Sequence, residues 1–123
     1  MAAPPRPPKP GRLRRGLELD RIFEHGRRVH GRLITLVGCA SPEHGRLGVP
    51  CGRRFSKRAV DRNRFRRLVR EAFREVRASM PGSIDYVVLP RGKPGDATFR
   101  ALVEELPSLA KQLARKLSTE AVP

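Results

Sequence analysis

The longest regular pattern in this chain is an amphipathic segment between residues 53 and 77. Its apolar residues recur every three or four positions, which is the spacing of one face of an α-helix. They are Phe65, Leu68, Val69, Ala72, Phe73 and Val76. The adjoining polar face consists of Asn63, Arg66, Arg67, Arg70, Arg74 and Arg77. The pattern predicts a long helix with an apolar inner face and a cationic outer face.

A short helix is predicted before this segment, over residues 17 to 24, where apolar residues recur at helical spacing. Gly26 is a natural C-terminal stop for that helix. Residues 1 to 16 contain five prolines and five basic residues and little that could be buried. They are therefore expected to form a mobile, partly extended arm.

A third helix is predicted near the C-terminus, with either Thr98 or Asp96 as its cap. Pro107 is expected either to kink this helix or to divide it. Five leucines form a single stripe along it, which is expected to pack on a sheet. They are Leu102, Leu106, Leu109, Leu113 and Leu117. The folded domain is expected to span residues 17 to 117, followed by a tail over residues 118 to 123.

Strands are predicted where the apolar pattern changes. Residues 32 to 40 are rich in β-formers, residues 46 to 53 alternate large and small residues, and residues 84 to 89 are a short apolar run. The first two runs predict two strands, or three if the first run bends. Because a strand, a long helix and a strand follow one another, the last two strands are expected to pair in parallel.

One face of the second predicted strand lacks large side chains, because Gly48, Pro50 and Gly52 alternate along it. Two interpretations fit this pattern. Another backbone could approach closely at this face, or Pro50 could simply mark an edge strand. In either case, a strand face without large side chains comes directly before the cationic segment in the sequence.

Charge is concentrated in two parts of the chain, whose net formal charge is +15. Residues 1 to 16 contribute +5 and residues 53 to 77 contribute +8, whereas the two remaining stretches contribute +1 each. Arginine outnumbers lysine by 22 to 5. Arginine suits bidentate phosphate contacts, although a high genomic GC content also favours it. The localisation of the charge indicates an electrostatic footprint for a polyanion.

Length and composition limit the remaining classes. The chain offers room for one domain, and no apolar run approaches the length of a membrane span. The Pro-rich start lacks the apolar segment of a signal peptide, which predicts a cytoplasmic protein. Cys39 and Cys51 have no zinc-site spacing and are expected to be buried thiols. The isolated protein is expected to be a monomer.

Groups for independent catalysis are not evident in the sequence. His25, His30 and His44 show no metal-ligand or catalytic spacing. Acidic residues within the cationic segment, such as Asp61, are expected to pair with arginines rather than to hold Mg²⁺. The Gly-Lys-Pro sequence ending at Pro94 lacks the Ser or Thr of a phosphate-binding loop and predicts a turn. These observations favour a binding protein.

The order of these motifs resembles the bacterial ribonuclease P protein component. The most specific part is Ala-Val-x-Arg-Asn-Arg-x-Arg-Arg at residues 59–67, followed by Arg-Glu-x-Phe-Arg at residues 70–74. Further matches are Arg-Leu-Arg-Arg at 12–15, Phe-Glu-His-Gly at 23–26, Arg-Leu-Gly-Val at 46–49, Arg-Arg at 53–54 and Asp-Tyr-Val-Val at 85–88. The resemblance covers residues 12 to 117.

The resemblance implies an α/β (α+β) single-domain sandwich, αβββαβα, with a left-handed βαβ crossover, contrary to the usual handedness. It also implies an accessory subunit of an RNA-based endonuclease that removes 5′ leaders from precursor tRNA. In that family the RNA subunit is the catalyst and holds Mg²⁺ mainly through RNA groups, so the polypeptide alone is expected to be non-catalytic. No cofactor is expected on the protein itself.

Two groups of site residues follow from the resemblance. The first is expected to bind the RNA subunit and consists of Arg53, Arg54, Lys57, Arg58, Arg62, Asn63, Arg64, Arg66, Arg67 and Arg70. The second is expected to line a cleft for the single-stranded leader and consists of Leu19, Phe23, Val37, Gly48, Pro50 and Gly52. Leu19 and Val37 stand where the family often has aromatic residues, which predicts weaker base stacking.

Two other classes are compatible with the residues themselves. A small ribosomal protein can carry the same basic helix on an α/β sheet, and sedimentation with ribosomal subunits would indicate it. An independent nuclease would cleave precursor tRNA without any RNA subunit. The family resemblance favours the ribonuclease P subunit over both.

Overall fold

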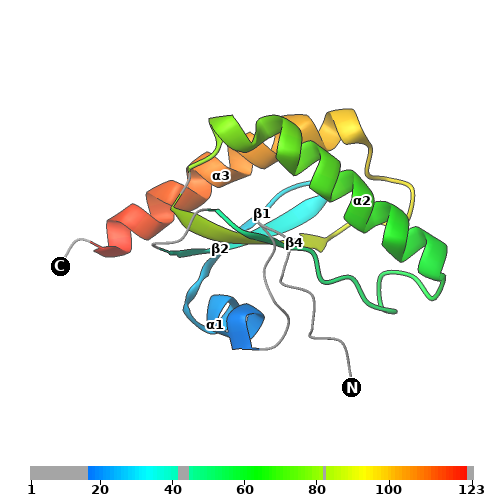
Figure 1. Cartoon of the computed structure of the whole chain (residues 1–123), viewed down its shortest axis with the longest axis horizontal. Coiled ribbons are helices and arrows are strands. Elements are labelled where there is room, and N and C mark those ends of the chain that lie inside the picture. The colour runs from blue at the N-terminus through cyan, green and yellow to red at the C-terminus, as the bar shows by residue number, and fades with distance from the viewer. Residues whose placement is uncertain (1–16, 42–44, 82, 122–123) are drawn as a thin grey trace, which may run out of the picture.

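The structure is a computed structural model, and it describes residues 17–41, 45–81 and 83–121 (Figure 1). The elements in chain order are α1 (Leu17–His25), β1 (Arg27–His30), β2 (Ile34–Ala40), β3 (Leu47–Gly48), α2 (Ala59–Val76), a 3₁₀ turn (Arg77–Ser79), β4 (Ile84–Pro90) and α3 (Phe99–Ala121). This order confirms the predicted αβββαβα fold. The predicted arm, residues 1–16, lies outside the described residues.

The four strands form one mixed sheet in the order β1-β2-β4-β3. β2 is antiparallel to β1 and to β4, whereas β3 is parallel to β4. The parallel pair confirms the prediction, since α2 connects β3 to β4. β3 is an edge strand, and no atom would lie within 4 Å of a Cβ at Gly52. The edge position agrees with the edge-strand interpretation of Pro50, and the open space beside Gly52 also leaves room for another backbone to approach.

The third of the three early strands does not come from a bend in residues 32 to 40. It is β1, which precedes that run and has the sequence Arg-Arg-Val-His. Only Val29 in β1 is buried. A single apolar residue gives no alternating pattern, which is why the sequence did not reveal this strand.

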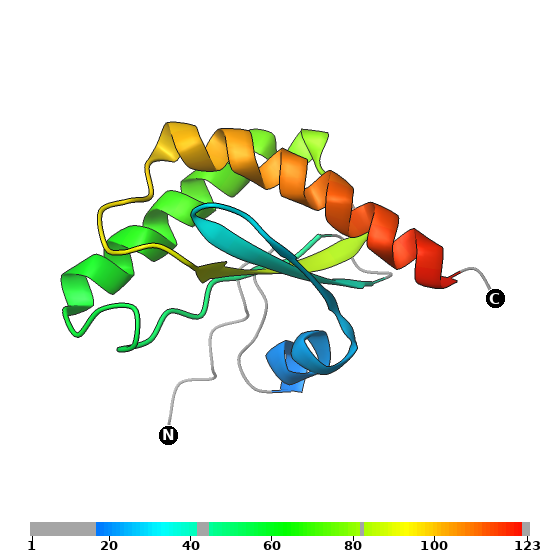
Figure 2. The same ribbon diagram turned by 180° about the vertical axis from the view of Figure 1, so that it is seen from behind.

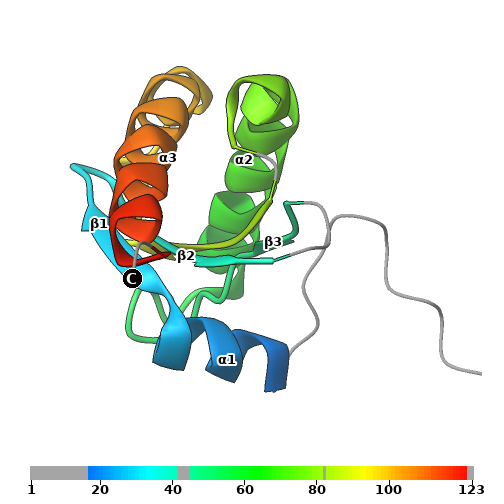
Figure 3. The ribbon, with the colours of Figure 1, turned by 90° about the vertical axis from the view of Figure 1, so that its left-hand side faces the viewer.

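Helices cover the two faces of the sheet unequally. Figure 3 shows α2 and α3 side by side on one face and α1 alone on the other. Seen from behind, α3 runs along the sheet over β1 and β2 (Figure 2). The molecule therefore has three layers, with a helical pair, a sheet and a single short helix.

The main core lies between the sheet and the helical pair. α2 contributes Phe65, Val69, Ala72, Phe73 and Val76, the positions expected from its periodicity. Phe73 meets Tyr86 of β4 edge to face, with ring centroids 6.1 Å apart. Four of the five predicted leucines of α3 are buried in this core, and Leu117 packs at its margin. Burial of this apolar surface is the main source of stability.

The structure decides between the alternatives predicted for α3 and extends its C-terminal end. The backbone N–H of Ala101 donates to Thr98 Oγ1 at 3.2 Å, so Thr98 is the cap. Asp96 instead accepts from the N–H of Lys93 in the preceding turn. Pro107 lies inside one continuous helix and does not divide it. The helix continues to Ala121, four residues into the segment expected to be a tail.

α1 ends at a close approach between its last turn and β2. The N–H of Gly26 donates to the carbonyl oxygen of Ile22 at 2.8 Å. A Cβ at Gly26 would lie 2.4 Å from that oxygen and 2.6 Å from the carbonyl oxygen of Gly38. Any larger residue would therefore push α1 away from the sheet, which explains why the predicted stop is a glycine.

Candidate nucleic-acid interface

The cationic face of α2 and the loop before it present their charges to solvent. The exposed members are Arg53, Arg54, Lys57, Arg58, Asn63, Arg64 and Arg67, and the half-buried members are Arg62, Arg66 and Arg70. The opposite face of α2 is fixed in the main core. All ten residues predicted to bind RNA are thus presented by one rigid helix and the segment that leads into it.

Two of these arginines also donate hydrogen bonds to backbone carbonyl oxygens of the segment before α2. Arg66 donates from Nη2 to the carbonyl oxygen of Cys51 at 2.6 Å and from Nε to that of Val49 at 3.4 Å. Arg62 donates from Nη1 to the carbonyl oxygen of Ser56 at 2.9 Å. These acceptors are neutral, so both side chains keep their positive charge. Arg66 and Arg62 therefore fix the chain before α2 while adding to its positive field.

Asp61 is bound differently from the prediction. Its carboxylate accepts a hydrogen bond from the Ser56 hydroxyl at 2.8 Å, and no arginine pairs with it in the described part of the chain. The Ser56 oxygen in turn accepts from the backbone N–H of Arg58 at 3.1 Å. Ser56 and Asp61 thus organise the first turn of α2, where a negative charge is favourable. The prediction that Asp61 pairs with arginine is wrong.

A pocket of about 480 Å³ opens beside this helix. One wall is Leu19 from α1, and Arg66 and Arg70 from α2 form the other. The chain from Gly48 to Gly52, which leaves β3, contributes the rest of the lining. The structure therefore brings four of the six predicted cleft residues to one pocket, and it adds two arginines there.

The other two predicted cleft residues, Phe23 and Val37, do not line this pocket. Val37 is 0% exposed and packs with Ile22 and Val87 beneath α1. Phe23 packs against the same cluster, and the guanidinium of Arg28 lies 5.5 Å from its ring centroid. A ligand in the pocket would not touch Val37, because α1 covers it. Val37 was assigned to the cleft from the family resemblance, which did not show that α1 covers this residue in the present chain.

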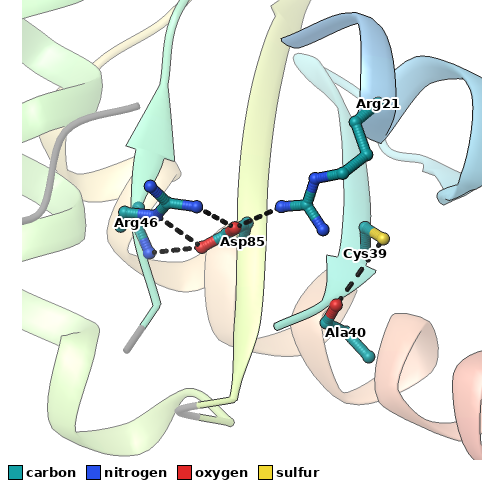
Figure 4. A network of polar contacts seen from close by, with 5 residues as sticks. All are labelled: Arg21, Cys39, Ala40, Arg46 and Asp85. Carbon is teal, nitrogen blue, oxygen red and sulfur yellow. Dashed lines mark hydrogen bonds and ion pairs between the residues drawn. The ribbon is translucent and has the colours of Figure 1, made fainter. Parts of the chain in front are cut away.

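A buried ion-pair network connects α1 with β4 and with the residue that precedes β3 (Figure 4). Asp85 of β4 is 0% exposed. Its carboxylate accepts hydrogen bonds from Arg46 Nη2 at 2.8 Å and from Arg46 Nε and the Arg46 backbone N–H, both at 3.2 Å. Arg21 of α1 donates to the same carboxylate at 2.9 Å. One carboxylate thus joins α1, β4 and the residue that precedes β3.

Two opposing effects set the acidity of Asp85. Burial raises the pKa of this carboxyl, but the hydrogen bonds and charge of Arg46 outweigh burial and hold the pKa below its ordinary value of 3.8. Sequence reasoning missed this network, although a signal was present. An acid inside the apolar run Ile-Asp-Tyr-Val-Val can be buried only with a cationic partner.

Other reactive groups are scattered in the described part of the chain. His30 Nδ1 lies 3.0 Å from Thr35 Oγ1, and His25 is exposed beside Glu24, whereas His44 lies outside the described residues. Burial raises the pKa of the Cys51 thiol, partly offset by Arg66 and Arg62. Cys39 is only half-buried, which contradicts part of the cysteine prediction.

Residues 17–41, 45–81 and 83–121 offer no candidate metal site and no membrane-spanning helix. These residues contain no group of three or more His, Cys, Asp or Glu side chains arranged to hold a metal ion. None of their helices is both long enough and apolar enough to cross a bilayer.

The fold and site define a small α+β protein with a solvent-exposed basic helix. Residues 8–114 match the family model of Ribonuclease P. The "Ribonuclease P protein component" of Methylococcus capsulatus is 35% identical over 94% of this chain and 91% of its own length. The protein of that name from Desulfotalea psychrophila is 40% identical over 73% of each chain.

Solved structures of ribonuclease P proteins are also similar to this chain in fold. The ribonuclease P protein from Thermotoga maritima aligns with a TM-score of 0.73 and 30% identity, over 82% of this chain and 96% of that one. The Staphylococcus aureus ribonuclease P protein aligns with a TM-score of 0.70 and 27% identity, over 85% and 95% of the two chains. The chain belongs to the ribonuclease P protein family. It is a protein subunit of the ribonucleoprotein enzyme that matures the 5′ end of tRNA.

Proposed function

We propose that the cationic face of α2 is the surface that binds the RNA subunit of ribonuclease P. The proposed contacts are the ten predicted residues Arg53, Arg54, Lys57, Arg58, Arg62, Asn63, Arg64, Arg66, Arg67 and Arg70. The observation that carries this proposal is a dense row of arginines on a helix whose other face is locked in the core. Arg64 and Arg67 are exposed, and no acid pairs with them within the described ranges. Their charge is therefore available to phosphate.

The pocket beside Leu19 is proposed to receive the single-stranded 5′ leader of precursor tRNA. Gly48, Pro50 and Gly52 allow a nucleotide backbone to approach closely. Arg66 and Arg70 can contact its phosphates from the side of α2. Phe23 and Val37 would support this site from beneath α1 rather than touch the leader. Single-stranded RNA suits such a pocket because its bases and phosphates are both accessible.

The protein is proposed to act as a non-catalytic subunit that raises substrate affinity and screens repulsion between RNA molecules. In this proposal the RNA subunit supplies catalysis, and Mg²⁺ is held in the RNA-containing holoenzyme. The isolated polypeptide would be a monomer, and the holoenzyme would work in the cytoplasm. The positive charge of α2 supports the screening role, because two RNA molecules repel each other unless cations lie between them.

Charge reversal of Arg64 and Arg67 tests the proposed RNA-subunit surface. The double variant Arg64→Glu, Arg67→Glu should bind the RNA subunit roughly fiftyfold more weakly near 0.1 M salt, because each lost duplex contact contributes about 0.9 to the salt slope. Filter binding across a salt series would measure both quantities, and the slope should fall by about 2. The same reversal at exposed Arg100 on α3 is the matched control. Equal binding by the double variant and the wild type would exclude this surface.

The leader is tested separately with two substrates. Affinity of the holoenzyme is measured for precursor tRNA with a 5′ leader and for the same tRNA without one. For each enzyme form, the affinity for tRNA with the leader is divided by the affinity for tRNA without it. The leader contribution of the protein is this ratio for the holoenzyme divided by the ratio for the RNA subunit alone. A leader contribution above one supports the pocket, whereas a value of one would refute it.

A further inference from the structure

Two walls of the pocket, α1 and the chain at β3, are attached to the rest of the protein unequally. α1 rests on a small cluster in which only Ile22, Val37 and Val87 are fully covered. β3 pairs with β4 through two positions, Leu47 with Tyr86 and Gly48 with Val87. The ladder of β3 is short, but Leu47 is buried in the main core, and Arg66 holds the carbonyl oxygens of Val49 and Cys51. The cluster beneath α1 is small and contributes little. The position of α1 against β3 therefore needs a further contact.

Asp85 contacts both walls at once. Arg46, which is 18% exposed, surrounds the carboxylate with two side-chain donors and one backbone donor, and it directly precedes β3. Arg21, which is 40% exposed, reaches the same carboxylate from α1, two residues after the pocket residue Leu19. The carbonyl oxygen of Arg46 also accepts from the N–H of Tyr86 at 2.8 Å. The two walls are therefore joined through one side chain (Figure 4).

The burial of Asp85 makes this connection obligatory. A charged carboxylate with 0% exposure is costly unless cations and hydrogen-bond donors surround it. The Ser41 side chain adds one further hydrogen bond to those from the two arginines. Displacing α1 or the start of β3 would uncover or unpair the charge. The charged state thus favours the arrangement in which both walls are in place.

We propose that Asp85 is the positioning residue of the pocket and fixes the spacing between α1 and β3 through Arg21 and Arg46. This inference rests on the proposed leader-binding role of the pocket. Arg21 is the side of the network through which α1 can be released, because Arg46 still neutralises Asp85 when Arg21 is absent. Substitution of Arg21 should therefore loosen one wall and leave the main core intact.

The first experiment measures leader binding by the holoenzyme with Arg21→Gln. The leader contribution should fall about tenfold, the size expected for loss of one charge-assisted hydrogen bond. Affinity for the RNA subunit and for tRNA without a leader should be unchanged. Arg21→Lys keeps the charge and should restore most of the contribution. Arg32→Gln is the matched control, because Arg32 is exposed and its substitution removes an equal charge without touching α1 or Asp85.

The second experiment uses a native thiol and no RNA. Cys39 packs against the cluster beneath α1 and is half-buried, so its labelling rate should rise above the rate of the closed state when α1 leaves the sheet more often. Maleimide labelling of the free protein, resolved by mass spectrometry, should be several times faster at Cys39 in Arg21→Gln. Cys51 lies in the main core and should keep its wild-type rate. Arg32→Gln should label like the wild type at both sites.

The outcomes separate this inference from the proposed function. If the wild-type protein gives no leader contribution, the function of the pocket is refuted, and the Cys39 rate still decides whether Arg21 holds α1. If the wild type shows a leader contribution that Arg21→Gln keeps in full, the positioning role of Asp85 is overturned and the pocket function stands. Global unfolding of Arg21→Gln by circular dichroism would also overturn it, since the ion pair would then support the whole fold.

Discussion

The two faces of the sheet are stabilised in different ways. The face beneath α2 and α3 carries a continuous apolar core that includes residues from all four strands and both long helices. The face beneath α1 carries three fully covered apolar residues, a buried carboxylate and an open pocket. Figure 3 shows the contrast, with two long helices above the sheet and one short helix below it. One face holds the fold and the other leaves room for a ligand.

This difference has a consequence for motion. Opening the large core requires global unfolding, whereas α1 can leave its small cluster at a lower free energy. Elements that bind ligands commonly belong to the less stable part of a protein. The network around Asp85 limits that freedom, because it adds charge pairing where apolar contact is scarce. The main core and the proposed leader pocket therefore depend on different sides of the sheet, whereas the proposed RNA-subunit surface is the outer face of α2 on the core side.

The largest expected effect comes from a cavity in the main core. Leu106 is fully buried between α3 and the sheet. Leu106→Ala should lower the free energy of unfolding by roughly 2–5 kcal/mol, measured by urea denaturation. The leader contribution should be unchanged at temperatures where the variant is folded, because Leu106 and α1 lie on opposite faces. A matching loss of leader binding would show that the two faces are coupled and would break the comparison.

A smaller effect is expected from an aromatic residue on the α1 side. Leu19 lines the pocket, and a tyrosine there could stack on a leader base. Leu19→Tyr should strengthen leader binding by about 1 kcal/mol, at the low end of the range for base stacking. Affinity for tRNA without a leader is the control and should not change. Weaker or unchanged leader binding, with the fold intact, would indicate that bases do not meet this wall.

The smallest expected effect is a pH dependence on the same side. Because the folded pKa of Asp85 lies below its ordinary value, its charge stabilises the fold above that value. This contribution is lost as pH falls through the folded pKa, below 3.8. The effect is small because burial opposes the pairing. Denaturation of the wild type and Asp85→Asn should therefore converge as the solution is acidified below about pH 4. Curves that stay parallel would contradict a charged Asp85.

Much of the fold could be predicted because its signals are local. Helical spacing identified all three helices. The cationic face of α2 could be predicted from the sequence because residues three or four positions apart lie on the same face of a helix. β1 was missed because its four residues contain one apolar side chain. The lining of the pocket was predicted only in part, since Val37 is covered by α1. The resemblance that suggested Val37 does not specify how closely α1 packs on it in this chain.

The sequence by itself determined the helices, the location of the charge and the family, because these depend on residues that are neighbours along the chain. The tertiary structure alone decided that Arg21 meets Asp85, 64 positions away, and that Arg66 holds the carbonyl oxygen of Cys51. Such contacts depend on how α1 and β3 are placed against the sheet. Placement is set by packing between distant segments, and no local periodicity encodes it.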